Sequence, residues 1–513
     1  MYVFPLSCLF LRFFYSKRVN YLILLSISYF MQFKEYFNKN KTTLVPLIIV
    51  LIIVAAIDIN YLGLQSFWPD ESLYVGYANS LAKDPGFLFS EQLNQFIVHF
   101  PIIIISSLSF MGTVLAAKIT ILLFLVFGIF STYLLGSAIK DKTVGLFSAI
   151  FFALLPLTQF LTSRILLDVP IAAMVTFTLY CTLKYEKEKN MTWAAILGTA
   201  IFLTIFTKNA GILVLPIIGV YALLFNYKKI SSITKKPNLA VFAFVVLTIV
   251  VYLLRQFLMP NIQPFTGFTA IFSGGPLAYL ESLPFILSWY LIPFFLVGLV
   301  FTVLNVKSKK YLLLLLALGA YFIVISFLVP EKEPRYAMPV IPLLTIMCAY
   351  GLSKLRINKQ IGYVLIAFSV IILVPIYLDG YNLTMSKSFS YTGFPEAGNL
   401  LKTIATKDSI IYASSARSMY AFSGFKFEEY GGNIRLLPQT KEEFETVVNN
   451  TKDVYIELDM WEYTQPDWIY PWDQEKIGYL QSLNFTVVKA INKPVLTQQG
   501  LTNQTVVAIL KKI

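Results

Sequence analysis

The sequence predicts a polytopic α-helical membrane protein of about 11 spans, followed by a C-terminal α/β domain. Of its 513 residues, 57% are hydrophobic and only 13% are charged, against about 25% charged in an ordinary soluble domain. The charge is also uneven. The first 379 residues carry 42 charged side chains with a net charge of +14, whereas the last 134 carry 27 with a net charge of −1. A soluble single-domain enzyme and a disordered basic protein are therefore excluded.

Residues 1–42 are expected to form a cytoplasmic N-terminal extension. Arg12, Lys17 and Arg18 interrupt its apolar stretch, and the part that follows is too short to span a bilayer. The favoured interpretation is that translation begins at Met31, which leaves a few lysines on the cytoplasmic side of the first span. A cleavable signal peptide is the alternative interpretation.

Residues 43–379 are expected to form the membrane domain, because apolar runs of the length that a bilayer requires follow one another there. The eleven runs lie at about 43–62, 113–139, 143–161, 168–184, 192–207, 209–226, 238–258, 284–305, 311–329, 337–353 and 361–378.

The connections between these runs alternate in charge. Fifteen Lys and Arg residues lie in alternate connections, at 140–142, 184–189, 228–236, 307–310 and 354–359. The positive-inside rule places these loops in the cytoplasm and the others outside. Residues 97–112 are apolar but short, and counting them as a span would place these cations outside. We therefore expect an interfacial or re-entrant segment there. Because the cations lie in short loops between apolar runs, as membrane topology requires, a nucleic-acid partner is not expected.

Residues 380–513 are expected to form a small extracytoplasmic α/β domain. Helical spacing in 395–406 and 441–450 alternates with strand-like runs beginning at 409, 454, 485 and 505, and this alternation is typical of layered α/β domains. Glycosylation sequons agree with an outside location, and they begin at Asn382, Asn449, Asn484 and Asn503.

The first outer loop, residues 63–112, carries two adjacent acids, Asp70 and Glu71. Leu73, Tyr77 and Leu81 follow at helical spacing and predict an amphipathic helix lying on the membrane. The two acids are then either an N-cap and a first-turn acid or a general base at the membrane surface.

Asp168 opens the fourth predicted span and could be a second acid on the same outer surface as Asp70. Its alternative role is structural, as a helix-start acid with an i,i+4 ion pair to Arg164. The outer cations either snorkel from span ends or bind a lipid phosphate. They are Lys83, Arg164, Lys208, Arg255, Lys332 and Arg335. With one histidine and three separated cysteines, neither a His-based metal site nor a disulfide framework is expected.

Five short motifs follow one another along residues 43–378. They are Trp68-Pro-Asp-Glu, His99-Phe-Pro, Ser163-Arg-Ile-Leu-Leu-Asp-Val-Pro, Phe206-Thr-Lys-Asn-Ala-Gly and Glu333-Pro-Arg-Tyr-Ala-Met-Pro-Val-Ile-Pro. In this order they resemble the motifs of GT-C fold glycosyltransferases of the protein O-mannosyltransferase and aminoarabinose transferase type, glycosyltransferase families 39 and 83.

The resemblance implies an integral-membrane enzyme that moves a sugar from a polyprenyl-phosphate donor, such as dolichol phosphate, with inversion. The acceptor would be a protein or a lipid-linked glycan at the outer membrane face. Asp70 would be the catalytic base, with Glu71 beside it and Asp168 as the later acid. The candidates for binding the donor phosphate are Lys83, His99, Arg164, Lys208, Arg255 and Arg335. The resemblance requires no cofactor and does not exclude a divalent metal.

Two other classes of protein were weighed against this one. A transporter or channel would require ionisable residues near the bilayer midplane and an internal repeat, and the sequence shows neither. A non-catalytic scaffold that presents its C-terminal domain would tolerate substitution of Asp70, Glu71 and Asp168 without loss of function.

Overall fold

The structure of the full chain is a computed structural model. It describes residues 41–64, 66–89, 100–226, 236–258, 275, 277–329, 332–355, 359–428, 431–451, 453–461 and 465–513. Residues 1–40 of the predicted extension 1–42, including the alternative start at Met31, lie outside the described residues, and residues 41–42 begin the first helix.

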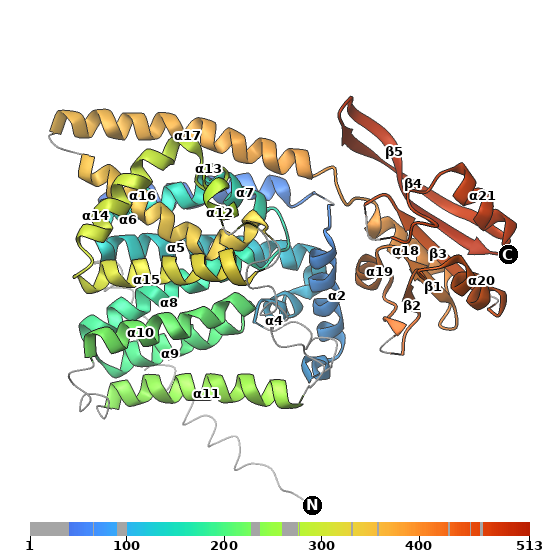
Figure 1. The fold of residues 1–513 in the computed structure, drawn as a ribbon, viewed down its shortest axis with the longest axis horizontal. Helices are drawn as coiled ribbons and strands as arrows, with labels where there is room; N and C mark the ends of the chain where they lie inside the picture. The colour runs from blue at the N-terminus through green and yellow to red at the C-terminus, as the bar shows by residue number, and fades with distance from the viewer. Residues whose placement is uncertain are drawn as a thin grey trace, which may run out of the picture. The chain divides into compact units, whose positions relative to one another are not determined.

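The first 387 residues are helical wherever regular structure is described (Figure 1). The helices are Lys41–Tyr61, α2 (Pro69–Lys83), η1 (Pro85–Phe89), α4 (Phe100–Ser107), η2 (Ser109–Met111), α5 (Thr113–Ile139), α6 (Lys142–Leu154), α7 (Pro156–Thr162), α8 (Asp168–Glu188), α9 (Met191–Ile205), η3 (Asn209–Leu213), α10 (Val214–Asn226), α11 (Lys236–Leu258), α12 (Ala278–Glu281), α13 (Leu283–Leu287), η6 (Trp289–Leu291), α14 (Ile292–Leu304), α15 (Lys309–Ile323), η7 (Val324–Leu328), η8 (Pro334–Val340), α16 (Ile341–Leu355) and α17 (Lys359–Lys387).

Every predicted span coincides with helix. Among the described residues, six helices are long and apolar enough to cross a membrane, and a seventh is formed if α6 and α7 count as one span bent by 61°. Pro156 begins α7 at this bend, where its ring prevents the α6 hydrogen-bond ladder from continuing. The other four predicted spans are helical but shorter, interrupted or less apolar.

Small residues allow close packing within the helical part. A Cβ on Gly298 of α14 would lie 1.9 Å from the Met347 carbonyl oxygen, and a Cβ on Gly351 of α16 would lie 2.0 Å from the Phe294 carbonyl oxygen. The backbones of α14 and α16 therefore touch, as small residues permit between membrane helices.

Residues 100–111 contain only the eight-residue α4 and the three-residue η2. Neither helix is long enough to cross a bilayer. Residues 97–99 of the interfacial or re-entrant segment expected at 97–112 lie outside the described residues, and its location at the membrane surface stays a prediction. At the other end of the membrane part, α17 continues through the predicted boundary at 379/380 and ends at Lys387.

The C-terminal domain is the expected α/β domain, built on a five-stranded sheet of order β2-β1-β3-β5-β4. Its elements are α18 (Phe394–Ile404), β1 (Ile410–Ala413), α19 (Ala416–Ser423), β2 (Ile434–Leu436), α20 (Lys441–Asn449), β3 (Val454–Asp459), α21 (Gln474–Ser482), β4 (Phe485–Thr497) and β5 (Gly500–Lys512). Strands β1, β2 and β3 are parallel, and β5 pairs antiparallel with β3 and β4. Three elements of nine residues or fewer were not predicted from the sequence: α19, β2 and α21.

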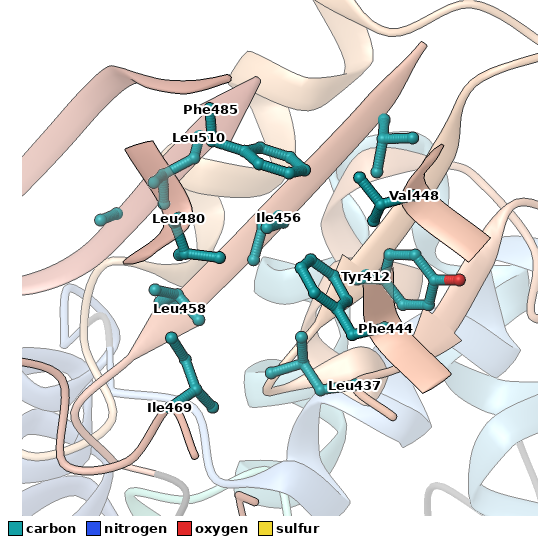
Figure 2. Close-up of a cluster of buried hydrophobic side chains, with 12 residues drawn as sticks. Tyr412, Leu437, Phe444, Val448, Ile456, Leu458, Ile469, Leu480, Phe485 and Leu510 are labelled. Carbon is teal, nitrogen blue, oxygen red and sulfur yellow. The ribbon is translucent and has the colours of Figure 1, made fainter. Parts of the chain in front are cut away.

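One face of this sheet carries the domain's hydrophobic core under α20 and α21. Figure 2 shows buried side chains of both helices gathered against strand residues. The cluster includes Phe444, Val448, Leu480, Tyr412, Ile456, Leu458 and Leu510. Because side chains alternate along a strand, the neighbouring β3 residues Tyr455, Glu457 and Asp459 point to the opposite face, where α18 and α19 pack.

Candidate active site

The helix that carries the first two acids, α2, begins through a contact between Glu71 and the backbone. Glu71 Oε2 accepts a hydrogen bond from the Trp68 backbone N–H at 2.8 Å, which satisfies a donor that the first helical turn leaves unpaired. Pro69 occupies the first helical position, where its missing N–H has no consequence. Asp70 is therefore not the N-cap, and its carboxylate is available for other contacts.

Glu71 is buried in a second set of contacts with the segment before α8. Its Oε1 accepts a hydrogen bond from the Ile165 backbone N–H at 2.6 Å, and Arg164 Nη1 lies 3.4 Å from Oε2. Burial raises the pKa of the Glu71 carboxyl, and the nearby Arg164 guanidinium and the two backbone N–H groups oppose that shift. Both oxygens of Glu71 are thus committed to holding α2 in place.

Arg164 was expected among the outer cations that snorkel or bind a lipid phosphate, but its side chain is buried inside the protein. It is 3% exposed and donates to Ser66 Oγ at 2.6 Å and to the Lys387 carbonyl oxygen at 2.8 Å. Its guanidinium also lies 4.9 Å from the centroid of the Trp68 ring. The structural alternative for Asp168, an i,i+4 ion pair with Arg164, is wrong, because Arg164 is buried and pairs with Glu71 instead.

Asp70 is partly exposed and lies between two arginines from distant parts of the chain. Arg335 Nη1 lies 3.2 Å from Asp70 Oδ2, and Arg417 Nη1 lies 3.2 Å from Asp70 Oδ1. Arg335 also binds Glu333. The sequence pointed to Arg335 but missed Arg417, which belongs to the unpredicted helix α19.

Asp168 is buried at the start of α8 and pairs with Lys208. Lys208 Nζ lies 2.6 Å from Asp168 Oδ1, and no donor among the described residues reaches the buried Asp168 Oδ2. The aromatic ring of Tyr336 lies 5.8 Å from Lys208 Nζ and 5.3 Å from the Arg335 guanidinium carbon. Tyr336 therefore lies between the two cations.

The two acids belong to one site. The cation of each pair lies against the same ring, because the Tyr336 centroid is 5.3 Å from the Arg335 guanidinium carbon and 5.8 Å from Lys208 Nζ. Burial raises the pKa of the Tyr74 hydroxyl well above its usual value, and the negative charges of Asp70 and Asp168 raise it further. The structure thus brings together the pairs Asp70–Arg335 and Asp168–Lys208, which we call the acid–cation cluster.

The helix α2 is covered on more sides than an amphipathic surface helix would be. Residues 71–78 are all buried, because α4 packs against α2 from the helical part and α19 packs against it from the C-terminal domain. Ser72 Oγ lies 3.1 Å from Ser418 Oγ, and Ser80 Oγ lies 2.7 Å from the Tyr420 hydroxyl. The expectation of an amphipathic helix with a single buried face is therefore wrong, and its location at the membrane surface stays a prediction.

Gly76 allows this close packing of α19 on α2. A Cβ at position 76 would lie 2.4 Å from Cε1 of the Tyr420 ring, which is itself stacked on Phe427. We expect Gly76→Ala to force the helices apart and destabilise the protein by about 1–3 kcal/mol, as overpacking does. Thermal unfolding in detergent would measure this. Gly63→Ala, where an added Cβ meets no atom within 4 Å, is the control, and equal midpoints for the two variants would contradict the packing argument.

Several predicted phosphate-binding residues do not join the cluster. Lys83 is exposed at the far end of α2, about 20 Å along the helix from Asp70. Lys332 donates to the carbonyl oxygens of Ile325 at 3.1 Å and Ser326 at 2.8 Å. His99 and the side chain of Arg255 lie outside the described residues.

An apolar cavity of about 510 Å³ lies between four helices of the membrane part. Its lining comes from α4, α5, α8 and α9, and includes Phe100, Phe124, Phe127, Met174, Phe177 and Leu203. Met174 is six residues from Asp168 along α8, a rise of about 9 Å, and Leu203 precedes Lys208 by five residues. The same two chain segments therefore supply one wall of the cavity and the Asp168–Lys208 pair.

Family models match two adjacent parts of the chain. Residues 86–276 match the dolichyl-phosphate-mannose-protein mannosyltransferase family, and residues 276–411 match the Alg9-like mannosyltransferase family. Among curated protein sequences, none matches this chain.

Three solved structures are similar over most of this chain. ArnT from Cupriavidus metallidurans, bound to undecaprenyl phosphate, has a TM-score of 0.64 at 12% identity and covers 92% of this chain and 98% of its own. The oligosaccharyltransferase AglB from Archaeoglobus fulgidus, in complex with an inhibitory peptide and a dolichol-phosphate, has a TM-score of 0.56 at 14% identity over 92% of this chain and 75% of its own. The arabinofuranosyltransferase AftD from Mycobacteria has a TM-score of 0.55 at 13% identity. The match covers 90% of this chain and 39% of AftD.

These similarities agree with the helical architecture and with the C-terminal strand-containing domain. They confirm the fold class and the enzyme class that the five motifs predicted. The chain has the GT-C fold and is a membrane glycosyltransferase.

Proposed function

We propose that this protein transfers a sugar from a polyprenyl-phosphate donor to a hydroxyl group of a protein or a lipid-linked glycan, at the outer membrane face and with inversion. The observation that carries this proposal is the acid–cation cluster, in which Asp70 and Asp168 pair with cations, together with an apolar cavity that is lined in part by the same chain segments as Asp168 and Lys208. A lipid donor with an anionic phosphate and a hydrocarbon chain needs both features.

Asp70 is the general base in this proposal. Its carboxylate is 33% exposed and can meet an acceptor hydroxyl, whereas Glu71 is buried and holds the start of α2 through both of its oxygens. Deprotonation by Asp70 lets the hydroxyl oxygen attack the anomeric carbon as the bond to phosphate breaks. The transition state has oxocarbenium character, as in glycoside hydrolysis, and single displacement inverts the anomeric configuration.

The leaving phosphate is stabilised by fixed cations, of which Arg335 and Lys208 are in place. Preorganised donors aimed at developing charge are often the largest contribution to catalysis. Asp168 positions Lys208 through its Oδ1, and its Oδ2 is available to a hydroxyl group of the donor sugar. The prenyl chain fits the apolar cavity lined by Phe100, Phe124 and Phe127. ArnT bound to undecaprenyl phosphate and AglB bound to a dolichol-phosphate support this class of donor.

The placement of charge along α8 supports action at the outer face. The helix is 21 residues long, begins with Asp168 and ends with a Lys-rich turn. Its two ends are therefore about 30 Å apart, which matches the bilayer core. Lys309 of the cationic connection 307–310 pairs with Glu186 at that far end. The positive-inside rule assigns these loops to the cytoplasm, and the acid–cation cluster then faces outward.

The test is transfer from a panel of radiolabelled polyprenyl-phosphate sugars by the purified protein in liposomes, with lysate protein and lipid-linked glycans offered as acceptors. Label that leaves one donor and appears in an acceptor fraction supports the proposal and names the sugar. If folded, inserted protein transfers label from none of the donors, the proposal fails.

A further inference from the structure

We propose that Arg417 of the C-terminal domain leaves Asp70 and binds the donor phosphate when the polyprenyl-phosphate sugar enters, so that donor binding releases the base. This inference rests on the proposed function. Its starting observation is that one arginine from each part of the protein binds one oxygen of Asp70, at 3.2 Å in both cases.

Arg417 is the cation near the acids that is most easily recruited. Its side chain is 47% exposed, against 14% for Arg335 and 24% for Lys208. Arg335 also binds Glu333, whereas Asp70 is the one carboxylate that Arg417 meets within the part of the chain that the structure describes. An exposed ion pair between two long-range partners contributes little to stability, so a ligand can replace it at low cost.

A phosphate competes well for such a side chain. The guanidinium is planar and presents paired N–H donors that match two phosphate oxygens. Two other basic groups nearby are already committed, because Arg164 is buried against Glu71 and Lys332 donates to backbone carbonyls. Arg417 is therefore the residue that can add positive charge where the donor phosphate lies between Arg335 and Lys208.

The backbone that carries Arg417 is held firmly although its side chain is exposed. Glu457 Oε2 accepts a hydrogen bond from the Ser415 backbone N–H at 3.1 Å, and Ser415 Oγ donates to Asp459 Oδ2 at 2.7 Å. Both acids are fully buried on the sheet face under α19 and favour the helix N-terminus, where negative charge is stabilising. On its other side α19 contacts α2 through Ser418 and Tyr420.

This arrangement links donor binding to the availability of the base. While both guanidinium groups bind Asp70, they neutralise its charge and occupy a position beside each oxygen. When the Arg417 side chain moves to the phosphate, one of the two guanidinium groups leaves Asp70. Asp70 Oδ1 is then free to accept a hydrogen bond from the acceptor hydroxyl. The donor then binds before the acceptor becomes reactive.

The experiment compares the dissociation constants of polyprenyl phosphate and of uncharged polyprenol for the full-length protein in detergent. We expect Arg417→Ala to weaken polyprenyl phosphate binding about tenfold or more, as loss of a charged hydrogen bond does, without affecting polyprenol. Arg417→Lys should recover part of the loss. Arg435→Ala, which removes an arginine paired with Glu428 in the same domain, should change neither constant. Unchanged polyprenyl phosphate affinity in Arg417→Ala would overturn the inference.

A double-mutant cycle tests whether Arg417 is shared between Asp70 and the phosphate. Asp70→Asn should tighten polyprenyl phosphate binding, because it frees the arginines, and this gain should shrink in the Arg417→Ala background. An equal gain in both backgrounds would show that Arg417 is not shared. If the wild-type protein binds polyprenyl phosphate no better than polyprenol, the proposed function fails as well. If only the Arg417 effects are missing, the proposed function stands.

Discussion

Asp70→Asn is expected to reduce sugar transfer by about 100- to 10,000-fold, the usual contribution of a positioned general base. The amide keeps the shape of the side chain but cannot accept the hydroxyl proton. The protein should still fold, because Asp70 is partly exposed and the start of α2 depends on Glu71 instead. The measurement is the initial rate of transfer from the productive donor, with the thermal midpoint recorded for the same preparation.

Asp84→Asn is the matched control for this substitution. Asp84 follows α2 immediately, is exposed and accepts a hydrogen bond from the Gly86 backbone N–H, and it lies far from the acid–cation cluster. We expect it to retain wild-type activity. Wild-type activity in Asp70→Asn, or an equal loss in Asp84→Asn, would remove the case for Asp70 as the base.

Arg164→Met is expected to destabilise the protein by about 3–5 kcal/mol, because it leaves Glu71 as an uncompensated buried charge. Arg164 and Glu71 are 3% and 1% exposed, and Arg164 also joins Ser66 to the end of α17. The thermal midpoint of the purified protein should fall accordingly. Expression in the membrane fraction should fall with it.

The control for this second substitution is Lys184→Ala. Lys184 forms an i,i+4 pair with Glu188 in which both side chains are about one-third exposed, and such pairs contribute about 0.2–1 kcal/mol. A thermal midpoint for Arg164→Met that is no lower than that of Lys184→Ala would show that the buried pair of Arg164 and Glu71 does not stabilise the fold.

Much of the fold could be predicted because apolar runs and alternating charge depend only on local sequence. The runs at 113–139 and 238–258, for example, coincide with α5 and α11 within two residues. Of the site residues expected from the sequence, Asp70, Asp168, Lys208 and Arg335 form two ion pairs whose cations lie against the same Tyr336 ring. Their catalytic and binding roles stay predictions.

The rest depended on contacts between distant segments. Spacing favoured an Arg164–Asp168 pair, but Arg164 pairs with Glu71, 93 residues away. Arg417 lies 347 residues from Asp70 on an eight-residue helix that lacks enough turns to show a periodic pattern. The all-round burial of α2 likewise follows from its packing against α19, which no pattern within residues 69–83 can reveal.

The anomeric configuration of the product tests the role of Asp70 most directly. With the productive donor and acceptor in hand, NMR coupling constants give the configuration of the sugar before and after transfer. Single displacement with Asp70 as the base predicts complete inversion. Retention, accompanied by a glycosyl ester trapped on Asp70, would show that Asp70 is a nucleophile and would contradict the proposed mechanism.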